Sequence, residues 1–160
     1  MIVNIEKFLM NKLNTKNNFI NITYNVLSIS CNVIVCIIIT LLYDNTHNKI
    51  YLKTLITCLT LMLFIKSTIK RHRPYSKYTH IYNNDIIKTH PHYSFPSIHT
   101  MCGIIISLII NSKMTTKLPI CIVLPTLIIL SRIGLGVHYL SDCLFSLVMT
   151  YTVKFVFYYL

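Results

Sequence analysis

Acidic residues are scarce in this chain, and that scarcity narrows the functions it can have. Four Asp and Glu stand against 15 Lys and Arg in 160 residues, which gives a formal net charge of +11. A basic balance suits a nucleic acid, an anionic membrane or a ligand that carries phosphate. The basic residues are spread between apolar runs instead of sharing one polar face, so we expect no nucleic-acid partner.

Charged residues of either sign are also few. They make up 12% of the chain, whereas hydrophobic residues make up 54% and the mean hydropathy is +0.60. A water-soluble domain of this length could not bury so much apolar surface. The composition therefore predicts a multi-pass integral membrane protein that is in contact with the bilayer and, by its length, forms one domain.

The sequence also lacks the patterns of a disulfide scaffold and of a metal site. Its six cysteines lie within or beside apolar runs and show no C-x-x-C spacing, so we expect small, buried hydrophobic side chains. There is no H-E-x-x-H motif and no cluster of thiols. We therefore expect no metal and no other cofactor. Residues 1–18 have no continuous apolar core, so we expect no cleavable signal peptide.

The N-terminal segment, residues 1–18, has the pattern of an amphipathic helix. Ile2, Ile5, Leu9 and Leu13 recur at helical spacing, as the apolar stripe of such a helix does. A helix of this kind suits the headgroup region of a membrane. The alternative is a disordered tail.

Five apolar runs follow, at about residues 20–43, 50–69, 97–112, 118–132 and 139–160. A helix needs ~20 residues to cross a bilayer, and the third and fourth runs are short of that length. Backbone groups must be paired inside hydrocarbon, so these runs should be helices. The predicted fold is an all-α integral membrane protein with about five transmembrane helices, in which residues 19–160 form one membrane-embedded domain.

Alternating helix directions bring three polar segments to one face of the membrane. The connection 70–96 is the only long one between the runs, and a long polar loop in a helical protein is often functional. The second helix ends and the third begins beside this loop, and the fourth and fifth helices are joined on the same side. Residues 66–74, 96–99 and 131–142 should therefore meet there.

The first two of these segments offer cations and a helix start. Lys66 lies near the end of an apolar run, where an ionisable side chain is costly unless it has a partner or a function. The alternative is that it extends to the interface. Arg73 precedes Pro74, which ends a helix. Pro96 suits the first turn of the third helix, and Ser97 lies among its free amides. A helix start of this kind is an anion site.

The remaining candidates are two histidines, a carboxylate and a third cation. His138 and Asp142 are four residues apart and would share a helix face. A carboxylate there binds one imidazole nitrogen and leaves the other free to attack. His99 supplies a second histidine, suited to a general acid, and Arg132 closes the fourth helix. Three cations suit a phosphoryl group. The alternatives are an interfacial histidine and a helix-capping aspartate.

The order and spacing of these residues resemble the type 2 phosphatidic acid phosphatase family, which also includes the vanadium haloperoxidases and glucose-6-phosphatase. The resemblance covers residues 66–142, about half of the chain. The matching motifs are K-x(6)-R-P (Lys66, Arg73, Pro74), P-S-x-H (Pro96, Ser97, His99) and S-R-x(5)-H-x(3)-D (Ser131, Arg132, His138, Asp142).

The resemblance implies a lipid phosphatase that works without a metal. His138 would attack phosphorus and form a phosphohistidine, Asp142 would orient it, and His99 would protonate the leaving group. The residues implied to hold the phosphate are Lys66, Arg73, Ser97 and Arg132. The implied substrate is a lipid phosphomonoester or diphosphate, such as phosphatidic acid or a polyprenyl diphosphate. The site would face the lumen or the extracytoplasmic side.

The chain departs from the family pattern in two ways. Ile98 stands where the family has glycine. Isoleucine would be strained there if the backbone needed a positive φ, and tolerated in the first turn of a helix. Family members in membranes have six helices, and five are predicted here. The alternative function is a catalytically inactive relative that binds phospholipid headgroups or a membrane partner; a channel subunit would explain the helices but not the motifs.

Overall fold

The structure, a computed structural model, describes residues 2–44, 49–86, 93–114 and 119–159. The elements in these ranges are all helices, as predicted. They are α1 (Ile2–Leu13), α2 (Asn18–Ser30), α3 (Val33–Tyr43), α4 (Ile50–Ile69), α5 (Pro74–Lys77), α6 (Ile98–Lys113), α7 (Ile120–Gly134) and α8 (Leu140–Tyr159).

The first apolar run forms two helices instead of the single one predicted. α2 and α3 meet at an angle of 47°, and Asn32 begins α3 because its side chain accepts a hydrogen bond from the Val35 amide at 2.9 Å. An asparagine at this position stabilises a new helix start. α4 and α8 are long and apolar enough to cross a membrane, and the bent pair would make a third span. α6 and α7 are shorter, so a total of five spans stays a prediction.

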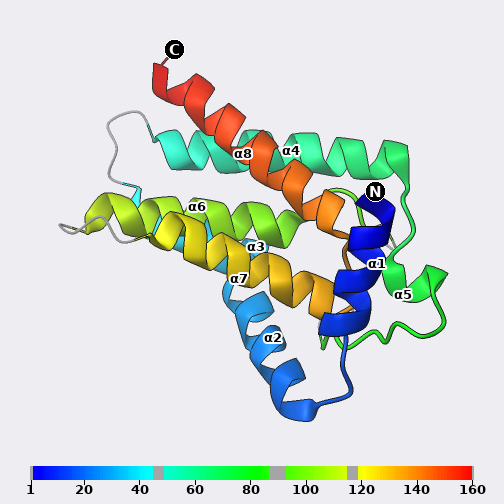
Figure 1. Ribbon diagram of the computed structural model, residues 1–160. Helices are drawn as coiled ribbons and strands as arrows, with labels where there is room; N and C mark the ends of the chain where they lie inside the picture. The colour runs from blue at the N-terminus through cyan, green and yellow to red at the C-terminus, as the bar shows by residue number, and fades with distance from the viewer. Residues whose placement is uncertain (1, 45–48, 87–92, 115–118, 160) are drawn as a thin grey trace.

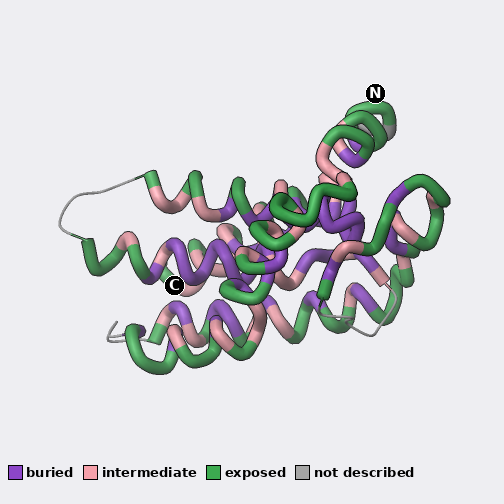
Figure 2. The backbone as a smooth tube through the Cα atoms, turned by 90° about the horizontal axis from the view of Figure 1, so that it is seen from below, coloured by how far each residue is buried: buried purple, intermediate pink, exposed green. Residues whose placement is uncertain are grey.

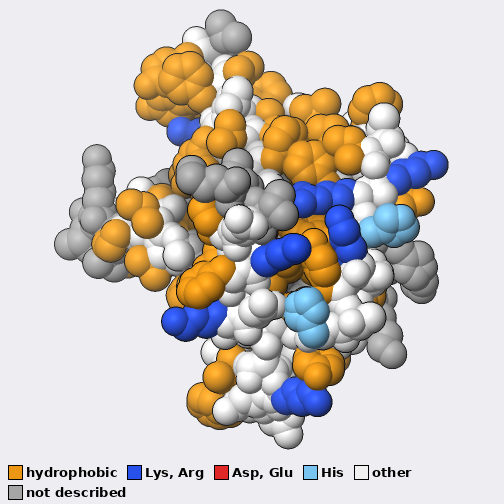
Figure 3. Space-filling view, turned by 45° about the vertical axis from the view of Figure 1, so that its right-hand side comes forward, with side chains coloured by type: hydrophobic (Ala, Val, Ile, Leu, Met, Phe, Trp, Pro, Cys, Tyr) orange, Lys and Arg blue, Asp and Glu red, His pale blue; other side chains and the backbone are white. Residues whose placement is uncertain are grey.

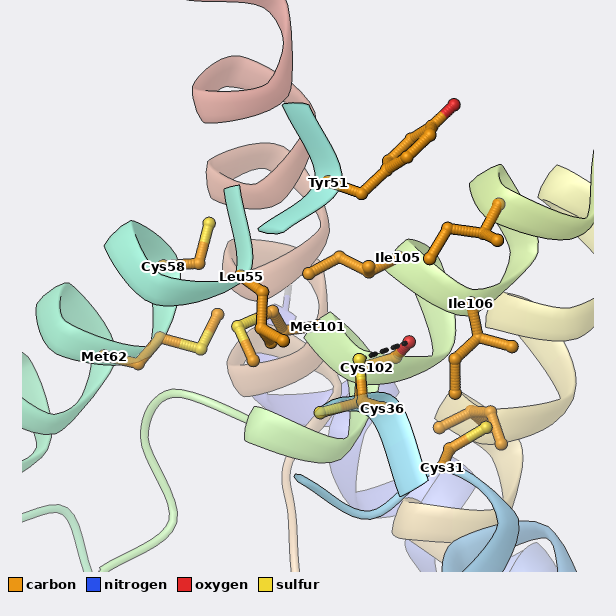
Figure 4. Packing of buried hydrophobic residues seen from close by; sticks show 12 residues of the cluster. Cys31, Cys36, Tyr51, Leu55, Cys58, Met62, Met101, Cys102, Ile105 and Ile106 are labelled. Atoms are coloured by element: carbon orange, nitrogen blue, oxygen red, sulfur yellow. Dashed lines mark hydrogen bonds between the residues drawn. The ribbon is translucent and has the colours of Figure 1, made fainter. Parts of the chain in front are cut away.

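The core of the bundle surrounds α6, which packs against α3, α4, α7 and α8. Figure 1 shows α6 and α7 side by side, with α4 and α8 crossing next to them. Met101 and Ile105 of α6 meet Leu55 and Met62 of α4 in the buried cluster of Figure 4. The six cysteines are free, and all but the partly buried Cys121 are fully enclosed, which confirms the expectation of small buried side chains for the other five.

The outer faces of the helices are strongly apolar. Figure 2 shows buried residues along the inner sides of the bundle and exposed ones outside. Large hydrophobic side chains such as Ile34, Phe64, Ile122 and Val148 are more than half exposed. Continuous apolar surface of this kind marks contact with lipid. The chain is therefore an integral membrane protein.

The N-terminal helix α1 packs against α7 at the end of the bundle where α5 also lies (Figure 1). Its inward face differs from the predicted stripe, because Ile5 of that stripe is 45% exposed, whereas Glu6 and Met10, which lie outside the stripe, are buried. A helix forms over Ile2–Leu13 of the predicted segment 1–18, and its buried face contains a carboxylate. That carboxylate reaches the candidate site.

Candidate active site

Four helix ends meet where the alternating topology predicted: the end of α4, the start of α6, the end of α7 and the start of α8. The backbone amide of Ser97 donates to Ser146 Oγ on α8 at 2.8 Å. Arg73 Nη1 donates to the Val137 carbonyl at 3.2 Å, although the two residues are 64 positions apart. Together with the contact from the Ser97 amide to the Asp142 carbonyl at 3.4 Å, these bonds join the three polar segments at one end of the bundle.

Helix α6 begins at Ile98, although Pro96 was predicted to lie in its first turn. Ser97 is its N-cap, with Oγ accepting from the Thr100 amide at 3.5 Å and from the Thr100 hydroxyl at 3.0 Å. Pro96 therefore precedes the helix instead of occupying its first turn, and Ile98 is the first helical residue. Ser97 has the N-cap role that short polar side chains favour, and the first turn of α6 faces the candidate site.

His138 and Asp142 lie close together, although His138 precedes α8 instead of belonging to it. His138 Nδ1 is 3.5 Å from Asp142 Oδ2, and the two side chains are 2% and 0% exposed. The same carboxylate oxygen accepts from the Tyr139 amide at 2.9 Å, so it also caps α8. A distance of 3.5 Å is longer than a well-formed hydrogen bond, and contacts of this kind often tighten only when substrate binds.

All three predicted cations are buried around this pair. Lys66 Nζ donates to the Tyr93 carbonyl at 3.2 Å; its buried position disfavours the alternative in which it only extends to the interface. Burial, and then the charges of Arg73, Arg132 and Lys66, hold the pKa of His138 well below its usual range. The imidazole is therefore neutral at pH 7 and has a nitrogen lone pair available.

His99 completes the set at the first turn of α6. Its Nε2 atom is buried and has no hydrogen-bond partner within the described ranges, and the same is true of Arg132 Nε. Buried polar atoms without partners are uncommon in folded proteins and call for an explanation. A bound oxyanion between them would supply the acceptors.

Arg132 is held by two residues that the sequence did not single out. Its guanidinium donates to Asp85 Oδ2 at 2.9 Å, and it makes a short contact with Ser28 Oγ of α2. Arg132 is fully buried. Asp85 belongs to the connection 70–96, so this ion pair fixes the connection to α7, and Arg132 in turn contacts α2 through Ser28.

Two further residues missed by sequence reasoning contact the His138–Asp142 pair. Arg71 Nη1 donates to Asp142 Oδ1 at 2.5 Å and to Ser141 Oγ at 2.7 Å. Glu6 of α1 accepts from the Ser141 amide at 2.9 Å and lies 3.6 Å from Arg71. The signal that could have drawn attention to Glu6 is that the chain has only four acidic residues. All four carboxylates are buried in the structure.

Within the described part of the chain, no three His, Cys, Asp or Glu side chains are grouped as metal ligands would be. The carboxylates of the site each face an arginine or a histidine instead. The three buried cations of the site, Lys66, Arg73 and Arg132, disfavour a bound metal ion and favour an anion.

The fold is similar to that of two solved structures. One is described as the first transmembrane PAP2 type phosphatidylglycerolphosphate phosphatase from Bacillus subtilis, with 20% identity and a TM-score of 0.70 over 97% of this chain and 85% of that one. The other is LpxE of Aquifex aeolicus, with 18% identity and a TM-score of 0.71 over 96% of this chain and 94% of that one. A comparison with curated proteins found no match.

A family profile described as the PAP2 superfamily matches residues 48–160, well over half of the chain. The match contains the three motifs and the four helix ends that meet at the site. Residues 1–47, with α1 and the bent pair, lie outside it. The resemblance drawn from the motifs is thereby confirmed: the chain belongs to the PAP2 superfamily.

Proposed function

We propose that this protein is a membrane lipid phosphatase that removes phosphate from a lipid phosphomonoester or diphosphate. The observation that carries the proposal is the gathering of two histidines, one carboxylate and three cations at the meeting point of four helix ends, where all of them except the partly buried His99 are buried. Burying that many charged groups is costly unless they act together. Membership of the superfamily supports the same conclusion, and one of the two solved structures with this fold is described as a phosphatidylglycerolphosphate phosphatase.

The proposed reaction begins at His138. Its Nδ1 faces Asp142, which leaves Nε2 to attack phosphorus. As the nitrogen–phosphorus bond forms, the bond from phosphorus to the leaving oxygen breaks, and His99 gives that oxygen a proton. Water then attacks phosphorus, and the nitrogen–phosphorus bond breaks as the new oxygen–phosphorus bond forms. His99 takes a proton from the water, and phosphate leaves His138 free. Splitting the displacement into two steps in this way is nucleophilic catalysis with general acid–base assistance.

Cations and the start of α6 would hold the phosphoryl oxygens. Lys66, Arg73 and Arg132 surround His138 closely enough for their charges to lower its pKa. Two of the Arg132 nitrogens bind Asp85 and Ser28, so we assign its buried Nε to the substrate. Ser97 fixes the first turn of α6, where amides and helix dipole favour negative charge. Fixed donors of this kind stabilise the charge that develops in the transition state.

The test is phosphate release by the detergent-solubilised full chain in the presence of EDTA. Phosphatidic acid, lysophosphatidic acid and a polyprenyl diphosphate are the substrates. We expect turnover of at least one of them, no effect of the chelator, and inhibition by vanadate, which mimics the five-coordinate transition state. A folded protein that releases no phosphate from any substrate would support the inactive, headgroup-binding relative instead.

Ile98 does not disable the site by backbone strain. It is the first residue of α6, it is not among the described residues with positive φ, and its side chain packs against the core. We expect Ile98→Gly to lower the free energy of unfolding by about 1 kcal/mol, through lost burial and lower helix propensity, without any gain of activity. Thermal unfolding with parallel phosphate-release assays measures both, and Ile98→Val is the matched control. A rise in activity in Ile98→Gly would contradict this assignment.

A further inference from the structure

An open pocket with a volume of about 560 Å³ lies beside the candidate active site. It is formed by α1, the end of α4, α5 and the segment before α8. Six of its lining residues carry the argument: Glu6, Lys70, Arg71, His72, Lys77 and Tyr139. None of the residues proposed to hold the scissile phosphate lines it. The pocket is therefore a separate space next to the reacting group, with room for more than one phosphate.

The pocket is strongly cationic. Lys70, Arg71 and Lys77 line it together with His72, and Glu6 is the only carboxylate among its lining residues. Glu6 is already engaged, since it accepts from the Ser141 amide and lies beside Arg71. On the face that Figure 3 shows, Lys, Arg and His side chains gather around an apolar hollow and no acidic side chain is visible. Such a surface attracts an anion.

One residue joins the pocket to the reacting pair. Arg71 lines the pocket and donates to Asp142 Oδ1 at 2.5 Å, and its guanidinium lies 3.9 Å above the Tyr139 ring. Tyr139 follows His138 directly in the chain. A substrate whose phosphate reaches His138 would therefore place the adjoining part of the molecule in or beside this pocket.

Lys70 is placed toward the pocket by an unusual backbone conformation. It caps the end of α4 with a φ of 51°, in the left-handed region that lysine adopts rarely. This conformation ends the helix and starts the segment Lys70–Arg71–His72, all three residues of which line the pocket.

We propose that this pocket binds a second anionic group of the substrate, next to the phosphate that reacts. The inference rests on the proposed function and deepens it. Either of two sources would supply the anion: the inner phosphate of a lipid diphosphate, or the phosphodiester of a phospholipid whose headgroup ends in a phosphomonoester. Both present the same oxyanion to Lys70, Lys77 and Arg71. A phosphomonoester lipid without a second anion leaves the pocket without a charged ligand.

The kinetic test uses the double variant Lys70→Gln/Lys77→Gln. Both lysines are exposed, so the fold should tolerate the change. For the substrate whose second anion reaches the pocket, we expect KM to rise at least tenfold with little change in kcat. This is the pattern of lost ground-state binding. The rise for phosphatidic acid should be several-fold smaller. Assays with a polyprenyl diphosphate and with the phosphodiester-containing lipid decide which source fits.

The matched control is Lys53→Gln/Lys113→Gln. It removes the same charge at the opposite ends of α4 and α6, where both lysines are also exposed. If the control raises KM as much as the pocket variant, the effect is general electrostatics and the proposal is overturned. Equal KM changes for all substrates in the pocket variant would overturn it as well.

A binding measurement separates the pocket from the chemistry. Calorimetric titration of the full-length His138→Ala protein with inorganic phosphate and pyrophosphate needs no turnover. We expect pyrophosphate to bind at least tenfold more tightly, and this preference to disappear in the triple variant that also has Lys70→Gln and Lys77→Gln. If the preference is found but no substrate is hydrolysed by the parent protein, the proposed function fails and the pocket assignment stands. If the preference is absent, the pocket assignment fails.

Discussion

His138→Ala should lower the rate of phosphate release by on the order of 10³-fold or more, as removal of a nucleophile does in enzymes that use covalent catalysis. The expected loss is large because no other described side chain is placed to replace the imidazole. His99 lies on α6 with the general-acid role, and Asp142 is tied to Arg71 and the Tyr139 amide. The measurement is kcat and KM for the best lipid substrate in the detergent-solubilised protein.

His80→Ala is the matched control for this experiment. His80 is an exposed histidine in the connection 70–96, with Nε2 3.0 Å from Asn11 Oδ1. Its loss should leave phosphate release close to that of the parent. Size-exclusion chromatography and thermal unfolding show whether each variant is folded. The residual activity expected after the loss of a nucleophile is far below a tenth of the parent activity. A folded His138→Ala protein that retains a tenth or more would therefore rule out the phosphohistidine mechanism.

Asp85→Ala should destabilise the protein by about 3–5 kcal/mol, because it leaves the buried guanidinium of Arg132 without its carboxylate. Arg132 is fully buried, and its Nη2 is 2.9 Å from Asp85 Oδ2. For a chain of this length the loss corresponds to a fall in Tm on the order of 10 °C. Thermal unfolding in detergent measures it. Activity should fall as well, since Arg132 would no longer be fixed in place.

Two variants test the cause of that destabilisation. Asp85→Ala/Arg132→Met removes both charges, and we expect it to be more stable than Asp85→Ala alone, since an apolar pair is often no worse than a buried ion pair. Thr79→Ala, an exposed change in the same connection, should leave Tm within about 1 °C of the parent, as surface substitutions usually do. If Asp85→Ala unfolds at the parent temperature, the ion pair does not hold the connection in place.

The three motifs predicted which residues meet because their spacing is tied to helix ends. Lys66 ends one apolar run, Ser97 begins another, and Arg132 and His138 flank the connection between two more. In an all-helical membrane protein, successive helices reverse direction, so topology follows from the order of apolar runs alone. This is why the convergence of the three segments could be predicted before any contact was known.

Local capping was less predictable. The apolar run at 20–43 is almost uninterrupted, so its division at Asn32 into α2 and α3 left little trace in hydropathy. His138 and Asp142 have helical spacing, yet the helix begins between them at Leu140. In both places a side chain that binds a backbone amide decides where the helix starts, and hydrophobic periodicity does not register such a bond.

The order and spacing of apolar runs and motifs were enough to predict an all-helical membrane protein whose three motifs lie at one end of the bundle. The partners of the charged side chains depend instead on how the helices pack. Glu6 reaches Ser141 across 135 residues, and Arg132 reaches Ser28 across 104. Periodicity reports the surroundings of a helix face, whereas an ion pair depends on which two faces meet and how deeply they are buried. In a chain with four carboxylates and 15 cations, packing is what selected Arg71 for Asp142 and Arg132 for Asp85.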